Sequence, residues 1–193
     1  MLDAANQRAE VLDTDALLLG RLHAGDVAAF ELLFERHYAT VFRALYGLTG
    51  SHEEAEDLAQ ETFLTLFRTP PRHKPGMSLA AWLCRVGLNR AYNRLRGARR
   101  ERQRAERLAE APAPAGPEEE LARSEERALV RQALAKLPER QARLLLLRHA
   151  GLSYAEVAQA LEIAPSSVGA LLARAEKAFV AAYAAGNDDE PVL

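Results

Sequence analysis

The sequence predicts an all-α protein built from two small helical domains joined by a flexible linker. Apolar residues recur at intervals of three and four through most of the chain, which is the spacing of one helix face. Convincing strand-like alternation of apolar and polar residues does not occur in the sequence. Between the helical stretches, the segment AEAPAPAGPEEE is too poor in large apolar residues to form a core. We expect domains over residues 13–97 and 123–184, with a linker over residues 98–122 that is partly extended.

Composition narrows the class of protein. The chain has 193 residues, 49% of them hydrophobic, which is enough for two small cores. The net charge of −2 provides no global attraction to nucleic acid, so a basic patch has to be local. The single cysteine, Cys84, excludes an internal disulfide and a multi-cysteine zinc site, and we expect a buried thiol. The sequence shows no signal peptide, membrane span, metal motif or catalytic set, so we expect a cytoplasmic protein without cofactor, metal or enzymatic activity.

Four helices are expected in the first domain, and capping residues predict where they begin. These are Asp13 or Thr14, then Asp26, then Ser51 with Glu54 three residues later, and finally Ser78. The third helix should point Ala55, Leu58, Ala59, Phe63, Leu66 and Phe67 inward. In the fourth, Trp82 lies on the stripe of Leu79, Leu83 and Val86, which favours a core position over base stacking. His37 also lies on an apolar stripe, which favours a core or boundary position over a ligand.

The second domain is predicted to end in a helix-turn-helix. Pro138 is expected to open one helix, and Ser153 with Glu156 forms a capping box for the next. Pro165 opens the last helix, which the arrangement would present to the major groove of DNA. Its centre, Gly169 to Leu172, carries no charge and no hydrogen-bonding side chain. The pattern therefore supports DNA binding by architecture more than by chemistry.

Basic residues concentrate after the fourth helix begins. Between Arg85 and Arg107 there are nine arginines and two acids, a local charge of +7 in a chain of −2. Asparagine and arginine offer the groups that read base edges, and arginine neutralises phosphate. Nucleic-acid contact and a solvated helix end are both open at this point.

Acidic residues dominate the third helix. Glu53, Glu54, Glu56, Asp57 and Glu61 lie on it, and neither lysine nor arginine occurs between Ser51 and Phe67. Such a surface would repel DNA and suits a basic protein partner. The alternative is a favourable charge cluster at a helix N-terminus, which explains the early residues better than Glu61.

Four passages resemble the extracytoplasmic-function (ECF) sigma factors of bacterial RNA polymerase. DVAAFELLFERHYATVFRALYGLTG is similar to the opening helices of their second sigma domain. EEAEDLAQETFLTLFR resembles the family's EDLxQExF segment, and SLAAWLCRVGLNRAYNRLRGARR its AWLxRIAxNxAxDxLRR segment. LPERQARLLLLRHAGLSYAEVAQAL is similar to the start of the fourth sigma domain. The resemblance covers nearly everything from Asp15 to Tyr183 except the linker.

The resemblance implies a sigma factor that binds core RNA polymerase and directs promoter-specific initiation. It would recognise and melt the −10 element and dock on the −35 element. Implied partners are the clamp helices of the largest subunit, the flap of the second-largest subunit, promoter DNA and an anti-sigma factor. For core polymerase the residues are Asp57, Leu58, Gln60, Glu61 and Phe63. For the −10 element they are Arg72, His73, Lys74, Arg85, Asn89, Arg90, Asn93, Arg94 and Arg96. For the −35 element they are Ser153, Tyr154, Ser166, Ser167, Gly169, Ala170, Arg174 and Lys177.

The last helix departs from the family pattern. Where the family commonly reads SVKSRLxRARxKL, this chain has Gly169, Ala170 and Leu171 at the Lys, Ser and Arg positions, and Glu176 at another Arg position. Each lost phosphate contact lowers the salt dependence of binding by about one unit. An alternative function is therefore a sigma-like polymerase-binding regulator whose weak −35 reading depends on a partner protein. The linker would also allow a compact form that occludes DNA without a partner.

Overall fold

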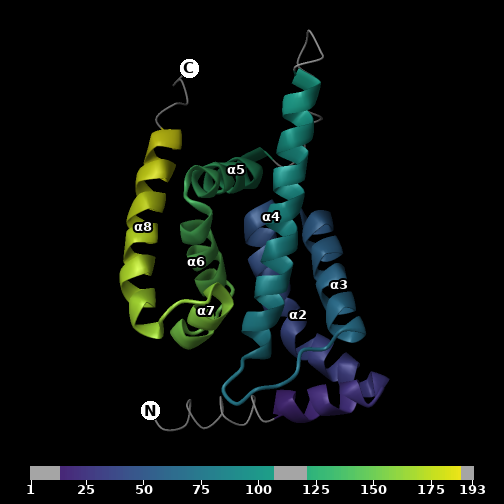
Figure 1. Ribbon diagram of the computed structural model, residues 1–193. Helices are drawn as coiled ribbons and strands as arrows, with labels where there is room; N and C mark the ends of the chain where they lie inside the picture. The colour runs from purple at the N-terminus through teal and green to yellow at the C-terminus, as the bar shows by residue number, and fades with distance from the viewer. Residues whose placement is uncertain (1–13, 107–120, 188–193) are drawn as a thin grey trace.

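The computed structural model describes residues 14–106 and 121–187, and its regular elements there are helices. A short helix over residues 14–23 comes first. It is followed by α2 (Val27–Thr49), α3 (His52–Arg68), α4 (Leu79–Glu106), α5 (Leu121–Lys136), α6 (Glu139–His149), α7 (Tyr154–Leu161) and α8 (Pro165–Asn187). Figure 1 shows α2, α3 and α4 as one bundle and α5 to α8 beside it, with α3 and α8 on opposite sides.

The predicted capping residues begin the helices of the N-terminal bundle. Asp26 accepts a hydrogen bond from the Ala28 amide at 3.0 Å, and Ser51 Oγ accepts one from the Glu54 amide at 3.3 Å. Ser78 Oγ accepts one from the Ala81 amide at 3.2 Å. Each bond satisfies a backbone donor that the first helical turn leaves without an intrahelical partner. Capping thus fixes the starts of three helices as the sequence predicted.

Aromatic side chains fill the contact between α2 and α3. The Phe34 and Phe63 ring centroids are 4.8 Å apart, and the Phe30 and Phe67 centroids are 5.1 Å apart. Phe63 is fully buried, whereas Phe67 keeps 44% of its surface exposed, so its predicted inward position was wrong. Phe67 lies at the last turn of α3, where only one edge meets α2. Trp82 is partly buried against the core, as its stripe predicted.

Polar groups are also buried in this bundle. His37 Nε2 lies 2.8 Å from Asp15 Oδ2, and Arg36 Nη1 donates to Asp15 Oδ1 at 2.5 Å. This cluster ties the short helix over residues 14–23 to α2. Cys84 is buried, and desolvation raises the pKa of its thiol to about 12, with Glu156 as a smaller cause. The prediction of a buried thiol is confirmed.

The C-terminal unit contains the predicted helix-turn-helix in α7 and α8. Ser153 and Glu156 form the expected capping box at the start of α7. Glu162 ends that helix in the left-handed region, with a φ of 55°. The turn leads to Pro165, the first residue of α8. Val168, Leu172 and Ala175 are buried against the rest of the unit, whereas Leu171 and Phe179 are only partly buried.

The first part of the predicted linker is helical. Helix α4 continues to Glu106, nine residues beyond the expected end of the first domain at residue 97. The added residues are mostly Ala, Arg, Glu and Gln, which favour helix, so the expected extended chain does not begin at residue 98. Helix α5 begins at Leu121, two residues before the expected second domain. Residues 107–120 lie outside the described residues.

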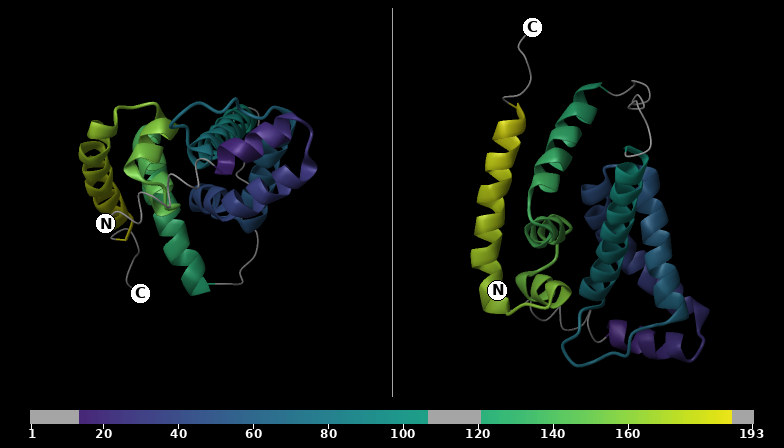
Figure 2. Two further views of the ribbon diagram at one scale, coloured as in Figure 1. Left: turned by 90° about the horizontal axis from the view of Figure 1, so that it is seen from below. Right: turned by 45° about the horizontal axis from the view of Figure 1, so that its top comes forward.

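The two helical units pack against each other. Helix α4 lies against α7, and α2 lies against α5 and α6, so that buried residues of both units form one continuous core. The views in Figure 2 show the C-terminal helices alongside the N-terminal bundle. Within residues 14–106 and 121–187, the longer helices are too polar or too charged to cross a membrane.

Candidate nucleic-acid and polymerase interfaces

One stripe of α4 faces the C-terminal unit. Asn89 Oδ1 accepts a hydrogen bond from Arg143 Nη1 at 2.7 Å. Arg96 Nη1 donates to Glu139 Oε2 at 2.8 Å, and Arg85 forms an ion pair with Glu162. We call these three contacts between α4 and the C-terminal unit the seam. Three residues predicted to bind the −10 element are therefore engaged by α6 and the turn after α7.

The Tyr92 side chain extends the seam. The Arg143 guanidinium lies over the Tyr92 ring, with Cζ 4.6 Å from the ring centroid. Burial raises the pKa of the Tyr92 hydroxyl to about 12, although the nearby Arg143 charge lowers it. The hydroxyl is buried and has no hydrogen-bond partner among the described residues. A buried polar group without a partner costs about 1–3 kcal/mol, so this part of the seam is imperfectly satisfied.

A second stripe of α4 faces α3. Arg94 Nη2 lies 2.6 Å from Glu61 Oε1, and Arg90 Nη1 lies 3.5 Å from Glu61 Oε2. Arg90 Nη2 also donates to Thr65 Oγ1 at 2.7 Å. The structure thus joins Glu61, predicted to bind polymerase, to two arginines predicted to bind DNA. The sequence had placed them on separate surfaces because it does not show which sides of α3 and α4 meet.

The outer surface of α3 is acidic and exposed. Asp57 and Gln60 are exposed on it, whereas Leu58 and Phe63 have only 2% and 1% of their surface exposed. Leu58 and Phe63 are thus buried in this structure, and their assignment to the polymerase interface stays a prediction. They lie on the inward stripe of α3, where aromatic and aliphatic neighbours cover them. Leu64 and Phe67 are large apolar side chains that α3 exposes, at 47% and 44%.

The loop before α4 is held by both units. His23 Nε2 lies 3.3 Å from the Pro71 carbonyl oxygen, which joins the loop to the short N-terminal helix. Gln159 of α7 donates to the Gly76 carbonyl at 2.7 Å and accepts from the Ser78 amide at 2.8 Å. Arg72 and Lys74 are exposed, and His73 is half-buried. The loop residues predicted to bind the −10 element therefore precede the N-terminus of α4.

The predicted −35 surface lies on α8 and is open. Ser166, Ala170, Arg174 and Lys177 are exposed there, and Ser167 and Gly169 are partly exposed. Ser153 is different, because its hydroxyl is used in the capping box and donates to Glu156 at 2.6 Å. Tyr154 is 48% exposed, and the Arg148 guanidinium lies over its ring at 5.3 Å. A Cβ at residue 169 would meet only the Tyr154 ring, at 3.7 Å, so packing does not require glycine.

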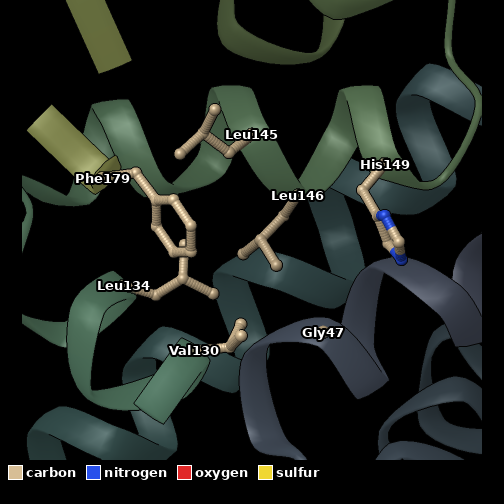
Figure 3. A pocket seen from close by; sticks show the side chains of 7 residues that line it. All are labelled: Gly47, Val130, Leu134, Leu145, Leu146, His149 and Phe179. Carbon is tan, nitrogen blue, oxygen red and sulfur yellow. The ribbon is translucent and has the colours of Figure 1, made fainter. Parts of the chain in front are cut away.

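An apolar pocket lies in the C-terminal unit beside the end of α2. Its volume is about 280 Å³, and it lies between α2, α5, α6 and α8. Figure 3 shows the side chains around it, with His149 as the one polar ring among Gly47, Val130, Leu134, Leu145, Leu146 and Phe179. Apart from Gly47, the lining residues belong to the C-terminal unit, so the pocket lies mainly between the helices of that unit.

Comparison with known proteins decides the family. The Sigma-70 region 2 family matches residues 33–101, and the Sigma-70 region 4 family matches residues 127–179. The ECF RNA polymerase sigma factor SigM of Mycobacterium tuberculosis is 30% identical, with 84% of this chain and 81% of SigM covered. The RNA polymerase sigma factor CarQ of Myxococcus xanthus is 32% identical, with 82% and 90% covered. This chain belongs to the ECF sigma factors.

Membership in this family gives the function. The chain acts in promoter-directed transcription initiation with core RNA polymerase, through a region 2 and a region 4. Solved structures support the fold. CnrH, in complex with the cytosolic domain of CnrY, has a TM-score of 0.66 at 23% identity, covering 89% of this chain and 98% of CnrH. RpoE from Bartonella quintana, in complex with the anti-sigma factor NepR, has a TM-score of 0.58 at 22% identity, covering 79% and 95%.

Sequence reasoning missed the residues of region 4 that contact region 2. Glu139, Arg143, Gln159 and Glu162 were not expected at any site, yet each bonds to α4 or to the loop before it. A polar side chain on an amphipathic helix gives no signal of its partner when that partner is more than 40 residues away in sequence. These contacts follow only from the packing of the two units.

Proposed function

We propose that region 2 recognises the −10 element with α4 and the loop before it. The observation that carries this proposal is the arrangement of α4, which follows the loop and holds two asparagines and four arginines between Arg85 and Arg96. Asn89 and Asn93 offer both donors and acceptors to base edges, and Arg90, Arg94 and Arg96 suit phosphate. Within the described residues, the family resemblance assigns recognition of the −10 element to no other surface.

Strand opening would follow from capture of an unstacked base. Unstacking a base costs a few kcal/mol, and stacking and hydrogen bonds at a receiving site offset that cost. The loop carrying Arg72, His73 and Lys74 is exposed at the N-terminal end of α4, where such a base would be received. Region 2 would need no nucleotide hydrolysis for this step, and we propose that the protein is not an enzyme.

The acidic surface of α3 is proposed to bind core polymerase. Asp57 and Gln60 are exposed on it, and Glu61 lies at its boundary with the arginines of α4. A negative surface complements basic helices such as those implied in the largest polymerase subunit. Because Glu61 already binds Arg94, we assign the main contact to Asp57 and Gln60, and the protein would act in the cytoplasm where polymerase is found.

Region 4 is proposed to hold the −35 element mainly through contacts with the phosphate backbone of the DNA. Ser166, Arg174 and Lys177 are exposed and suit phosphate contacts. Gly169 and Ala170, at the centre of the exposed surface, cannot hydrogen-bond to base edges. Reading of −35 bases would thus be weak. An anti-sigma factor is a further proposed partner, because CnrH and RpoE are seen in complexes with CnrY and NepR.

Transcription by reconstituted holoenzyme tests the proposed −10 site. Run-off transcription on fragments of the source genome would first identify a promoter. On that promoter, the double substitution N89A/N93A should remove two base contacts worth about 1–3 kcal/mol each, and lower initiation at least roughly thirtyfold. Q132A, which removes an exposed amide from α5, is the control and should leave initiation unchanged. Normal initiation by N89A/N93A would overturn the assignment of α4 as the −10 reader.

A further inference from the structure

A larger pocket than the one beside the end of α2 lies where the two units meet. Its volume is about 600 Å³, and residues of α2, α4, α5, α6 and the turn before α6 line it. Pockets of about 300–1,000 Å³ hold small molecules in many proteins, and they are common at contacts between domains. The contact of the two units therefore contains a space of suitable size for a ligand.

Aliphatic side chains form most of the pocket wall. They include Leu48 at the end of α2, Leu95 on α4, Leu134 on α5 and Leu137 in the turn that follows α5. Leu134 and Leu137 are each only 8% exposed, whereas Leu95 keeps 47% of its surface exposed. An apolar ligand that covers Leu95 gains free energy in proportion to the apolar area that it removes from water. The wall thus favours a ligand with a hydrocarbon part.

Two arginines of the wall have no carboxylate partner within residues 14–106 and 121–187. These are Arg99 on α4 and Arg131 on α5. Arg131 is half-buried, and its side chain lies so close to Gly50, the residue that caps α2, that a Cβ on Gly50 would clash with it. The negative end of the α2 dipole favours one cation at this place. It does not explain the second cation, so the pair suits an anionic ligand.

The Tyr92 hydroxyl is a further group without a partner at this pocket. It is buried and unpaired among the described residues, and the Arg143 guanidinium lies over the ring. Because burial raises the pKa of this hydroxyl to about 12, it keeps its proton near neutral pH and remains a donor. A buried donor without an acceptor is unfavourable, so a ligand oxygen that reaches Tyr92 would remove that cost.

The charges of the wall select the kind of anion. Three arginines and one glutamate line the pocket, and the glutamate, Glu139, already accepts hydrogen bonds from Arg96 and Arg143. A carboxylate can accept paired hydrogen bonds from a guanidinium. Glu139 would repel a second negative charge on the ligand. A monoanion with one planar head group therefore fits better than a dianion.

We propose that this pocket binds an aliphatic carboxylate, with its hydrocarbon chain against the leucines and its head group at Arg99, Arg131 and Tyr92. Tyr92 and Arg99 belong to region 2 and Arg131 belongs to region 4, so neither region forms the site alone. The inference does not rest on the proposed function, because these three residues are assigned neither to DNA nor to polymerase.

The first test compares ligands by isothermal titration calorimetry with the full-length chain. The probes are decanoate, decyltrimethylammonium and acetate, each at concentrations too low to form micelles. We expect decanoate to bind at one site and at least about tenfold more tightly than decyltrimethylammonium, because only the carboxylate accepts hydrogen bonds from charged donors. Acetate lacks the chain and should not bind measurably. Equal affinities for the two decyl compounds, or no saturable binding of decanoate, would overturn the proposal.

The second test removes one charge from the pocket. R131Q takes the half-buried cation out of the wall, and R68Q removes the same charge from an exposed position at the end of α3. We expect R131Q to bind decanoate at least about threefold more weakly than R68Q. Equal affinities of the two variants would contradict the head-group site.

The third test uses exposed positions, where a substitution leaves the packing intact. Leu95 at the pocket and Leu64 on α3 are both helical and both 47% exposed. L95E adds a carboxylate beside the proposed ligand, and L64E adds the same charge elsewhere. We expect decanoate to bind L95E at least about threefold more weakly than L64E, because like charges repel. Unchanged binding by L95E would show that decanoate binds elsewhere, and this comparison decides the matter if R131Q does not fold.

Discussion

The two surfaces proposed to meet DNA differ in chemistry and in how many of their groups are bonded to other side chains. The α4 surface is rich in guanidinium and amide groups, and its groups are bonded to Glu61, Glu139, Arg143 and Glu162. The α8 surface is open, and its centre holds Gly169 and Ala170. Guanidinium groups that bind DNA phosphates also bind carboxylates. The α4 surface, which carries more of these groups, is therefore the one to which acidic side chains elsewhere in the chain bond. Exposure alone is therefore a poor guide to which helix reads the promoter.

The difference also separates two tasks. A surface of small residues with a few charges can position DNA by its phosphates without reading its sequence. A surface of asparagines and arginines can read bases but needs protection from incorrect anionic partners. In this sigma factor, region 4 would contribute position and region 2 specificity, and the seam connects the two.

The largest expected effect comes from removing a buried aromatic ring at the contact of α3 with α2. Phe63 is fully buried at the contact of α3 with α2, so F63A should lower the free energy of unfolding by about 3–5 kcal/mol. Thermal or urea unfolding followed by circular dichroism measures this. L64A, on the exposed side of the same helix, should leave the free energy of unfolding almost unchanged. A stable F63A that binds polymerase poorly would instead support a direct role of Phe63 at the polymerase interface.

A smaller effect is expected on the α8 surface. R174A/K177A removes two phosphate contacts, so the slope of log affinity against log salt for duplex promoter DNA should become less steep by about 1.8. The ranking of −35 sequences should stay the same, because neither side chain is assigned to a base. Titrations of holoenzyme at several salt concentrations test both points. A changed ranking would mean that region 4 reads bases and would remove the contrast with α4.

The smallest effect is expected at Gly169. G169A should raise the free energy of unfolding by roughly 1 kcal/mol at most, because alanine favours helix and its Cβ meets only the Tyr154 ring at 3.7 Å. Gly50 is the contrasting position, since its φ of 66° strains any residue with a Cβ, and G50A should lower the same free energy. A destabilised G169A would show that a close contact requires this glycine.

Local sequence signals predicted much of the fold. Asp26, Ser51, Ser78 and Ser153 begin helices as expected, because capping depends on residues only two or three positions apart. The predicted polymerase-binding set includes Leu58 and Phe63, which the structure buries. A family motif mixes residues that touch a partner with residues that hold the helix in place, and only burial tells them apart.

By itself, the sequence determined the helices, their apolar faces, the basic and acidic stretches and the sigma-factor resemblance. These follow from spacing and charge within short windows of chain. The tertiary structure decided which groups meet: Glu61 with Arg94, Arg143 with Asn89, Leu146 with Gly47. Such pairs join helices distant in sequence, and their energies depend on how whole units pack. For that reason, the sequence indicated a DNA-binding surface on α4 but not that region 4 covers part of it.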